Sequence, residues 1–270
     1  GWEDGHNLRL DIHWSSTDLP QIRSDAAAVV SEAPDAIFTI SPDVLAAVLA
    51  ATHAIPTVFI QVPDPVGGGF VASIAHPGGN VTGFSAMDPS MAGKWLQLLK
   101  DSDPRLASAG ILFNSKTPAH AFYRSSAQVA ASALSISLIP IVADDAASIE
   151  RGIRGLAGKT RCGLLVLPHN VTVANHELII ALAAEQHLPA IYPFRLFADA
   201  GGLIYYGIDD NALFRQAAPY LDRILKGEKP GDLPVQAPTT FDLVLNLKTA
   251  KSMGFEFPPM LLARANAVIE

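Results

Sequence analysis

Strand-like and helix-like segments alternate along almost the whole chain, and this alternation limits the folds that it can adopt. Short runs rich in β-branched, aliphatic and aromatic residues are each followed by a longer segment with apolar side chains at helical spacing. The strand-like runs lie at residues 35–40, 55–62, 108–114, 137–143, 162–168, 189–194, 201–208 and 241–247, and an alternating apolar–polar run lies at 7–14. The helix-like segments lie at 19–33, 41–53, 88–102, 118–134, 145–157, 171–187 and 211–227, with a helical tail after 247. This order predicts an α/β fold whose parallel sheets have both faces covered by helices.

Two series of these segments flank a glycine-rich stretch, DPVGGGFVASIAHPGGNVTGFS, at residues 64–85. The chain has 270 residues, which is enough for two lobes, since single domains typically hold about 100 to 200 residues. We therefore expect two doubly wound lobes. In sheets of this kind, ligands bind beyond the carboxyl ends of the strands.

The glycines of this stretch could cradle a phosphate group or could serve the geometry of the backbone. Pro63 and Pro65 interrupt the strand-to-helix turn that a dinucleotide loop requires, and the sequence contains no G-x-x-x-x-G-K-[ST] pattern. Gly78 and Gly79 permit a positive φ, which is typical of tight turns. We predict a strand end at Asp64, a short helix at 69–75, a tight turn at 77–80 and a strand that leads toward the second lobe.

The composition argues against several classes of protein and of site. The chain holds 26 acidic and 19 basic residues and no basic cluster, so nucleic acid is not a predicted partner. Cys162 is the only cysteine, which excludes a disulfide within the chain, and its apolar neighbours predict a buried thiol. The sequence has neither a G-x-S-x-G nucleophile motif nor an H-E-x-x-H zinc motif. We therefore expect no enzyme activity, no cofactor and no metal.

Several side chains at predicted strand ends allow two interpretations. His169 ends a strand, and it could form the wall of a pocket or lie in a solvated loop. Asp209 and its neighbour Asp210 could neutralise an ammonium group or cap a helix, because carboxylates are favourable at helix N-termini. Aromatic side chains at strand ends could stack on a ligand or pack in the core. They are Tyr192, Phe194, Tyr205 and Tyr206.

Six segments, taken in order, carry a resemblance to a known family. They are GWEDGHNLRLDIHW (1–14), IPTVFIQVPDPVGGGFVASIAHPGGNVTGFS (55–85), GKWLQLLKDSDP (93–104), LPAIYPFRLFADAGGLIYYGIDD (188–210), YLDRILKGEKPGDLPVQAPTTFDLVLNLKTAKSMG (220–254) and PPMLLARANAVIE (258–270). The chain resembles the substrate-binding proteins of ABC importers that have the periplasmic binding protein type I fold. More narrowly, it is similar to the branch that includes tryptophan- and tyrosine-binding proteins.

The resemblance implies two doubly wound parallel-sheet lobes joined by a hinge that the chain crosses several times. We expect lobe 1 to comprise residues 1–85 plus 208–238, and lobe 2 to comprise 86–207 plus 239–270, with crossings near 84–88, 206–210 and 237–241. Members of the family usually carry a further strand and helix before the segment that begins at Gly1. The resemblance therefore implies that lobe 1 lacks its N-terminal strand and helix, through a trimmed chain or a misplaced gene start.

The resemblance also implies the function. We expect a monomeric, periplasmic or membrane-anchored extracytoplasmic protein that captures a small solute in the inter-lobe cleft by hinge closure and delivers it to a membrane permease. By analogy the solute is an aromatic or other hydrophobic amino acid. Two alternatives are the ligand-sensing domain of a transcriptional regulator and an α/β enzyme. The full gene would separate import from regulation, because a leader peptide supports the first and a helix-turn-helix supports the second.

Strand-end positions then provide candidate ligand contacts. Lobe 1 contributes Ser41, which offers a hydroxyl at a helix start, together with Gln61 and Asp64. Lobe 2 contributes polar groups at Asn114, Thr117, His169 and Asn170. Apolar or stacking surface comes from Tyr192, Phe194 and Tyr206, and Asp209 is the candidate partner of an ammonium group.

Overall fold

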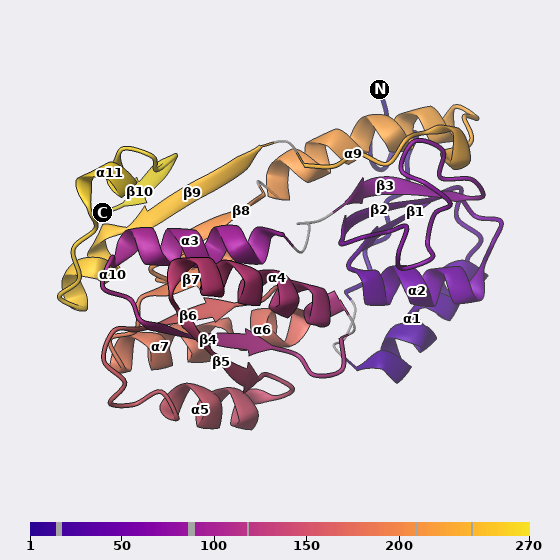
Figure 1. Cartoon of the computed structure of the whole chain (residues 1–270). Coiled ribbons are helices and arrows are strands. Elements are labelled where there is room, and N and C mark those ends of the chain that lie inside the picture. Colours follow the sequence, from indigo (N-terminus) through magenta and orange to yellow (C-terminus); the bar gives the residue numbers. More distant parts are fainter. Residues whose placement is uncertain (15–17, 86–89, 118, 209, 239) are drawn as a thin grey trace. The chain divides into compact units, whose positions relative to one another are not determined.

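The computed structural model describes residues 1–14, 18–85, 90–117, 119–208, 210–238 and 240–270. The chain forms two compact units, and each is built from two separate stretches of sequence. Unit 1 comprises Gly1–Asp88 and Asp210–Thr239, and unit 2 comprises Pro89–Asp209 and Thr240–Glu270. Figure 1 shows parallel strands and surrounding helices in both units.

Unit 1 is a three-stranded parallel sheet with helices on both faces (Figure 1). Its strand order is β1-β2-β3. Side chains of α1 and α2 pack with Ile37 on one face, whereas Phe38 and Phe84 contact aromatic rings of α9 on the other. The elements are α1 (Leu19–Ser31), β1 (Ile37–Ile40), α2 (Pro42–Ala51), β2 (Thr57–Val62), β3 (Val81–Ser85), α9 (Asp210–Leu225) and the 3-10 helix η1 (Pro230–Asp232).

Local sequence explains where these elements begin and how closely they pack. The Asp18 side chain accepts a hydrogen bond from the backbone N–H of Gln21 and so caps α1, and Pro42 occupies the first position of α2, where a missing N–H is tolerated. Gly83 pairs with Phe59 across β2 and β3, and a Cβ atom at Gly83 would lie 2.1 Å from the carbonyl oxygen of Phe59. Only glycine fits at this position of the sheet.

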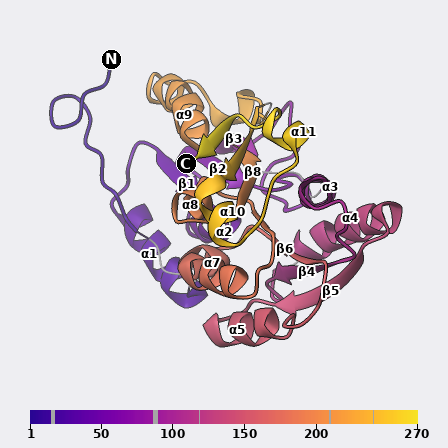
Figure 2. The same cartoon turned by 90° about the vertical axis from the view of Figure 1, so that its left-hand side faces the viewer.

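Two expectations for unit 1 are wrong. Residues 7–14 form no strand: among the described residues their alternating pattern finds no neighbouring strand, and Trp14 is 90% exposed. Figure 2 shows this segment as an indigo loop rather than as part of the sheet. Residues 69–75 form turns and bends instead of a short helix. Gly69 has a φ of 73°, and the N–H of Ala72 donates to Pro77, a forward bond that no helix makes.

Unit 2 contains a seven-stranded sheet of order β10-β9-β8-β7-β6-β4-β5. All of its neighbouring strands run parallel except β8 and β9, which are antiparallel. The elements are α3 (Met91–Ser102), β4 (Ser108–Phe113), α4 (Ala119–Leu134), β5 (Ser137–Val142), α5 (Ala146–Arg154), β6 (Cys162–Val166), α6 (Asn170–Ala174), α7 (His176–Glu185), β7 (Ala190–Tyr192), α8 (Arg195–Asp199), β8 (Ile204–Ile208), β9 (Phe241–Asn246), α10 (Leu247–Ser252), α11 (Pro259–Leu262) and β10 (Ala267–Ile269).

The core of unit 2 lies on the two faces of this sheet. Trp95 of α3 is fully buried, stacks on the ring of Tyr123 and donates its indole N–H to the carbonyl oxygen of Tyr206 at 2.6 Å. This bond satisfies the one polar atom of a large side chain that is otherwise held by apolar packing. The thiol of Cys162 is buried, as its apolar surroundings predicted.

Two expectations for unit 2 need correction. The predicted helix at 171–187 is two helices, α6 and α7, which meet at Asn175, whose backbone leaves the helical region with φ −111° and ψ 23°. The tail is also less helical than expected. It contains the short helices α10 and α11 but ends in β10, which pairs with β9 at the edge of the sheet.

Candidate functional site

In unit 1 the candidate residues lie at the carboxyl ends of β1 and β2. Ser41 directly follows β1. Gln61 is the second-last residue of β2, and Asp64 lies two residues beyond the end of that strand. All three have a positive φ, of 81°, 58° and 43°. For a residue other than glycine, a positive φ costs about 1 to 3 kcal/mol of free energy. Such residues are found more often at binding and catalytic sites.

The pairing of β2 with β3 shifts at Gln61. Ile60 pairs with Phe84 and Val62 pairs with Ser85, so Gln61 is the extra residue of a β-bulge. Bulges change the direction of a side chain and are common beside functional sites. The carboxylate of Asp64 is partly committed to its own loop, because Oδ1 accepts the backbone N–H of Gly67 at 2.8 Å.

Two hydroxyl groups at the end of β1 stand out because they are buried without a partner. The Oγ of Ser41 and the Oγ1 of Thr39 have no hydrogen bond to any residue that the structure describes. Buried hydroxyls are almost always hydrogen-bonded, so each unsatisfied one needs an explanation. Ser41 is also the N-cap of the ten-residue helix α2, and its side chain makes no capping bond. Its hydroxyl is therefore available at the positive end of a helix dipole.

In unit 2 the loop after β4 is held by its own hydrogen bonds. Asn114 is buried, and its Nδ2 donates to the carbonyl oxygen of Ala143, while its Oδ1 accepts from the N–H of Lys116 and from the hydroxyl of Thr117. The structure thus uses the polar atoms of Asn114 to shape the loop. The Thr117 hydroxyl takes part in the same arrangement.

Asp144, which follows β5, anchors this loop and was not among the predicted residues. Its two carboxylate oxygens accept the backbone N–H of Ser115 at 2.8 Å and the hydroxyl of Ser115 at 2.6 Å. The hydroxyl bond is the main reason why the pKa of Asp144 lies below its usual value. Nothing in the local sequence distinguishes this aspartate from Asp145, which instead caps α5.

The loop after β6 ends at His169, and Asn170 is the first residue of α6; both are half-buried. The Nδ1 atom of His169 accepts the backbone N–H of Val171 at 3.1 Å and caps α6. Burial lowers the pKa of His169, although the Asp144 carboxylate opposes that shift. An Nδ1 that accepts a hydrogen bond cannot carry a proton, so His169 is neutral with its hydrogen on Nε2. That N–H is a donor.

The aromatic candidates differ in their surroundings. Tyr192 is 1% exposed and stacks on Phe197 in the core of unit 2, and this burial raises its pKa. Phe194 is half-buried and packs at the margin of the same cluster. Tyr206 is half-buried and stacks on Phe241 at a centroid distance of 5.8 Å. Asp209 lies outside the described residues.

The predicted polar residues that the structure describes fall into two groups, one in each unit. The end of β1 and β2 gathers Ser41, Gln61 and Asp64, and the loops after β4 and β6 gather Asn114, Thr117, His169 and Asn170. Two further residues, Thr39 and His120, belong to these groups but were not predicted as contacts. Thr39 lies inside a strand and His120 lies inside a helix, so their polar roles depend on neighbours that the sequence does not show.

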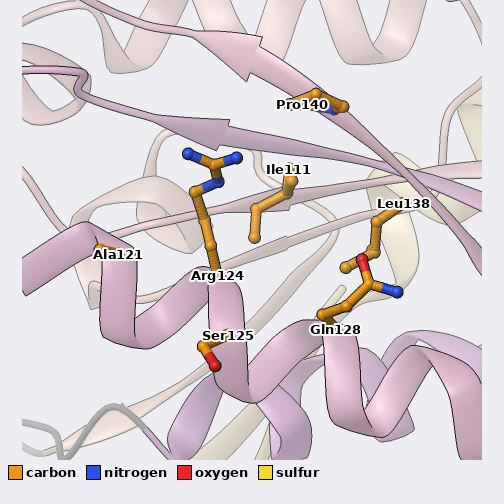
Figure 3. A pocket seen from close by; sticks show the side chains of 7 residues that line it. All are labelled: Ile111, Ala121, Arg124, Ser125, Gln128, Leu138 and Pro140. Carbon is orange, nitrogen blue, oxygen red and sulfur yellow. The ribbon is translucent and has the colours of Figure 1, made fainter.

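A separate hollow of about 450 Å³ lies in unit 2 between α4 and the strands β4 and β5 (Figure 3). In Figure 3 the guanidinium of Arg124 points from α4 toward the strands, and it lies 4.2 Å from the ring centroid of Phe113. The hollow is lined by Ile111, Ala121, Arg124, Ser125, Gln128, Leu138 and Pro140. None of these is a predicted site residue, and the hollow lies beside the strands instead of at their carboxyl ends.

Two features are absent from the part of the chain that the structure describes. No group of three or more His, Cys, Asp or Glu side chains there could hold a metal ion. No helix in it has the length and apolar character needed to cross a membrane.

Comparison with known proteins assigns the chain to a family. It is 28% identical over 256 residues to the tyrosine-binding protein of Clostridioides difficile (strain R20291), covering 95% of this chain and 73% of that protein. Its structure is similar to that of a conserved domain protein from Vibrio cholerae O1 biovar eltor strain N16961, with a TM-score of 0.91, 28% identity, and 99% and 89% of the two chains covered. It also shares the fold of an ABC domain in complex with L-Trp from Streptococcus pneumonia, with a TM-score of 0.84, 23% identity, and 93% and 86% covered.

The family description "ABC transporter substrate binding protein" matches residues 1–269. The resemblance inferred from the sequence motifs and the expected fold class are both confirmed. Members of this family are solute-binding proteins that act outside the cytoplasm together with an ABC permease. The chain belongs to the family of ABC transporter substrate-binding proteins.

Proposed function

We propose that this substrate-binding protein captures an aromatic or other hydrophobic amino acid and delivers it to the permease of an ABC importer. Two relatives support this choice of solute: one is a tyrosine-binding protein and the other was solved in complex with L-Trp. The protein works as a monomer, either free in the periplasm or anchored to the outer face of a membrane. The solute leaves the protein chemically unchanged.

One observation carries the proposed site, namely the buried and unpartnered hydroxyl of Ser41 at the start of α2. An amino acid presents a carboxylate, which accepts hydrogen bonds and is favoured at the positive end of a helix. Binding of that carboxylate would satisfy the Ser41 hydroxyl and the nearby free N–H groups of the helix. The positive φ of Ser41, Gln61 and Asp64 persists only because the surrounding structure holds it, as is common at binding sites.

Unit 2 carries candidate contacts of its own. His169 offers a neutral Nε2–H donor, and the side chain of Asn170 makes no hydrogen bond to another described residue. The half-buried rings of Phe194 and Tyr206 offer apolar surface for an aromatic side chain. Asn114 and Thr117 act by shaping the loop after β4, and β4 is the neighbour of β6, the strand that His169 follows.

Titration calorimetry with L-Trp and L-Tyr tests the proposal, and we expect at least one of them to bind. Ser41→Ala is expected to weaken that binding by about ten- to a hundredfold, because a hydrogen bond to a charged group contributes about 1.5 to 3 kcal/mol. Ser31→Ala is the matched control in the same unit: its hydroxyl bonds only to Ala28 within α1, so its affinity should equal that of the wild type.

A panel of solutes from other chemical classes separates the possible failures. If a sugar or a nucleoside binds and no amino acid does, the proposed solute class is wrong. If Ser41→Ala binds the amino acid as tightly as the wild type, the proposed carboxylate contact is wrong while the solute class stands. Chromatography of the solute after incubation checks that it is released unchanged.

A further inference from the structure

His120 occupies an unusual place in unit 2, because a polar ring is buried beneath the loops of the candidate site. It is the second residue of α4 and is 2% exposed. Asn114 follows β4 and Pro168 follows β6, and these two strands are hydrogen-bonded neighbours in the sheet. The imidazole lies within hydrogen-bond distance of the backbone of both loops.

The two ring nitrogens have opposite roles. The backbone N–H of Asn114 donates to Nδ1 at 2.8 Å, so Nδ1 carries no proton. The Nε2 atom lies 3.0 Å from the carbonyl oxygen of Pro168, which can only accept, so Nε2 carries the hydrogen. The ring is thus neutral and in a single tautomer. It accepts from one loop and donates to the other.

Few other side chains could replace this bridge. An apolar residue would leave a buried N–H and a part-buried carbonyl without partners, and the loss would be costly. Lysine and arginine cannot accept a hydrogen bond. Serine is too short to reach the backbone of both loops. A neutral histidine both accepts and donates across a rigid ring.

The surroundings keep the ring neutral. The pKa of His120 is lowered to about 4: burial is the main cause, the hydrogen bond to the Pro168 carbonyl opposes the shift, and the nearby His169 adds to it. The rings of His169 and Tyr123 pack edge-on against it at centroid distances of 5.6 and 6.2 Å. Asp144 faces His169 from the loop after β5 and is itself near Lys116.

We infer that His120 is a positioning residue for solute binding: its imidazole joins the loop after β4 to the loop after β6 and thereby fixes the segments at 114–117 and 168–170. The inference rests on the proposed function, because it assigns those segments to the solute site. His120 does not itself need to touch the solute. It acts through the backbone of Asn114 and Pro168.

Three substitutions dissect the bridge. His120→Asn places an amide oxygen near the position of Nδ1 and keeps the bond from Asn114, whereas His120→Gln places an amide N–H near Nε2 and keeps the bond to Pro168. His120→Phe keeps the ring shape and neither bond. We expect His120→Phe to weaken the binding of L-Trp or L-Tyr about tenfold, and each single-bond variant to recover part of that loss.

Amide hydrogen exchange of Asn114 measures, in the absence of solute, whether its hydrogen bond to the side chain at position 120 is present. The N–H of Asn114 should exchange slowly in the wild type and in His120→Asn, and about tenfold faster in His120→Gln and His120→Phe. Nitrogen-15 shifts of the His120 ring should show the neutral form with the hydrogen on Nε2 at pH 7. Below about pH 5 the wild type should lose solute affinity more steeply than His120→Asn, whose side chain does not titrate.

Two controls separate positioning from general loss of stability. Ile153→Ala removes a fully buried side chain of α5 and should lower the unfolding temperature of unit 2 without changing the exchange of Asn114. His176→Asn changes a half-buried histidine whose ring bonds to Val173 instead, and it should leave affinity unchanged. Should His120→Phe fail to fold, the contrast between His120→Asn and His120→Gln still decides the question.

The outcomes are distinct. Wild-type affinity and unchanged Asn114 exchange in both His120→Gln and His120→Phe would overturn the inference. Fast Asn114 exchange with unchanged affinity would overturn the role in solute binding. If the wild type binds neither L-Trp nor L-Tyr, the proposed function is wrong. The exchange of Asn114 then tests on its own whether His120 joins the two loops.

Discussion

Replacement of Gly83 by alanine should lower the free energy of unfolding by about 3 kcal/mol, at the upper end of the usual range for overpacking. The new Cβ atom would lie 2.1 Å from the carbonyl oxygen of Phe59 and 2.7 Å from its backbone nitrogen. Both are backbone atoms of the paired strand β2, so they cannot move away without breaking the pairing of β2 with β3. Chemical denaturation followed by circular dichroism measures the loss.

Gly79→Ala is the matched control from the same stretch of sequence. Gly79 has a φ of 73° and open space around a Cβ atom, so its replacement costs only the strain of a left-handed conformation, about 1 to 2 kcal/mol. Gly83→Ala should therefore be the more damaging change. Equal losses in the two variants would show that the sheet relaxes around Gly83 and that the close approach to Phe59 is not restrictive.

Stability should also depend on pH through His120, by about 3 kcal/mol between pH 7 and pH 4. His120 takes up a proton near pH 4 in the folded protein and near its ordinary value of 6.5 in the unfolded chain. Between these values the unfolded state holds more protons, so the free energy of unfolding falls as the pH falls from about 6.5 to about 4. The contribution is fully present above that window. The lowered pKa of His169 adds to the effect in the same direction.

Urea denaturation at pH 7, 6 and 5 measures this slope before most carboxylates titrate. Asp144, Asp145, Asp222 and Glu228 have lowered pKa values, so their contributions are lost mainly below about pH 5, as the acid range of their unfolded forms is reached. His120→Asn cannot take up the proton and should show a flatter profile. A wild-type profile as flat as that of the variant would contradict the buried neutral imidazole.

The sequence predicted most strands and helices of both units because each is marked by its own residues. The apolar run at 55–62 became β2, and the Ser41–Pro42 pair marked the start of α2. The alternation at 7–14 indicated a strand equally well, but alternation describes only where side chains point, and a strand also needs a partner to pair with. The antiparallel direction of β9 could not be predicted either, because the residue pattern of a strand is the same in both directions.

The sequence predicted where the candidate site residues lie better than it predicted what each side chain does. Topology places the ends of neighbouring parallel strands together, which led to Ser41 and His169. The commitment of Asn114 to its own loop and the burial of Tyr192 depend on exact distances to other segments. His120 carries no signal in sequence, because its partners Asn114 and Pro168 meet only when α4 lies over the ends of β4 and β6.

The split of unit 1 into two stretches has a consequence for the newly made chain as it leaves the ribosome. The rings of Phe38 and Phe84 are covered by α9, yet α9 is translated only after the long stretch of unit 2 from Pro89 to Asp209. At typical synthesis rates of about 5 to 20 residues per second, roughly ten seconds pass before α9 is made and can cover this face of the sheet. During biosynthesis the first-made strands therefore keep an apolar face exposed until α9 has been made.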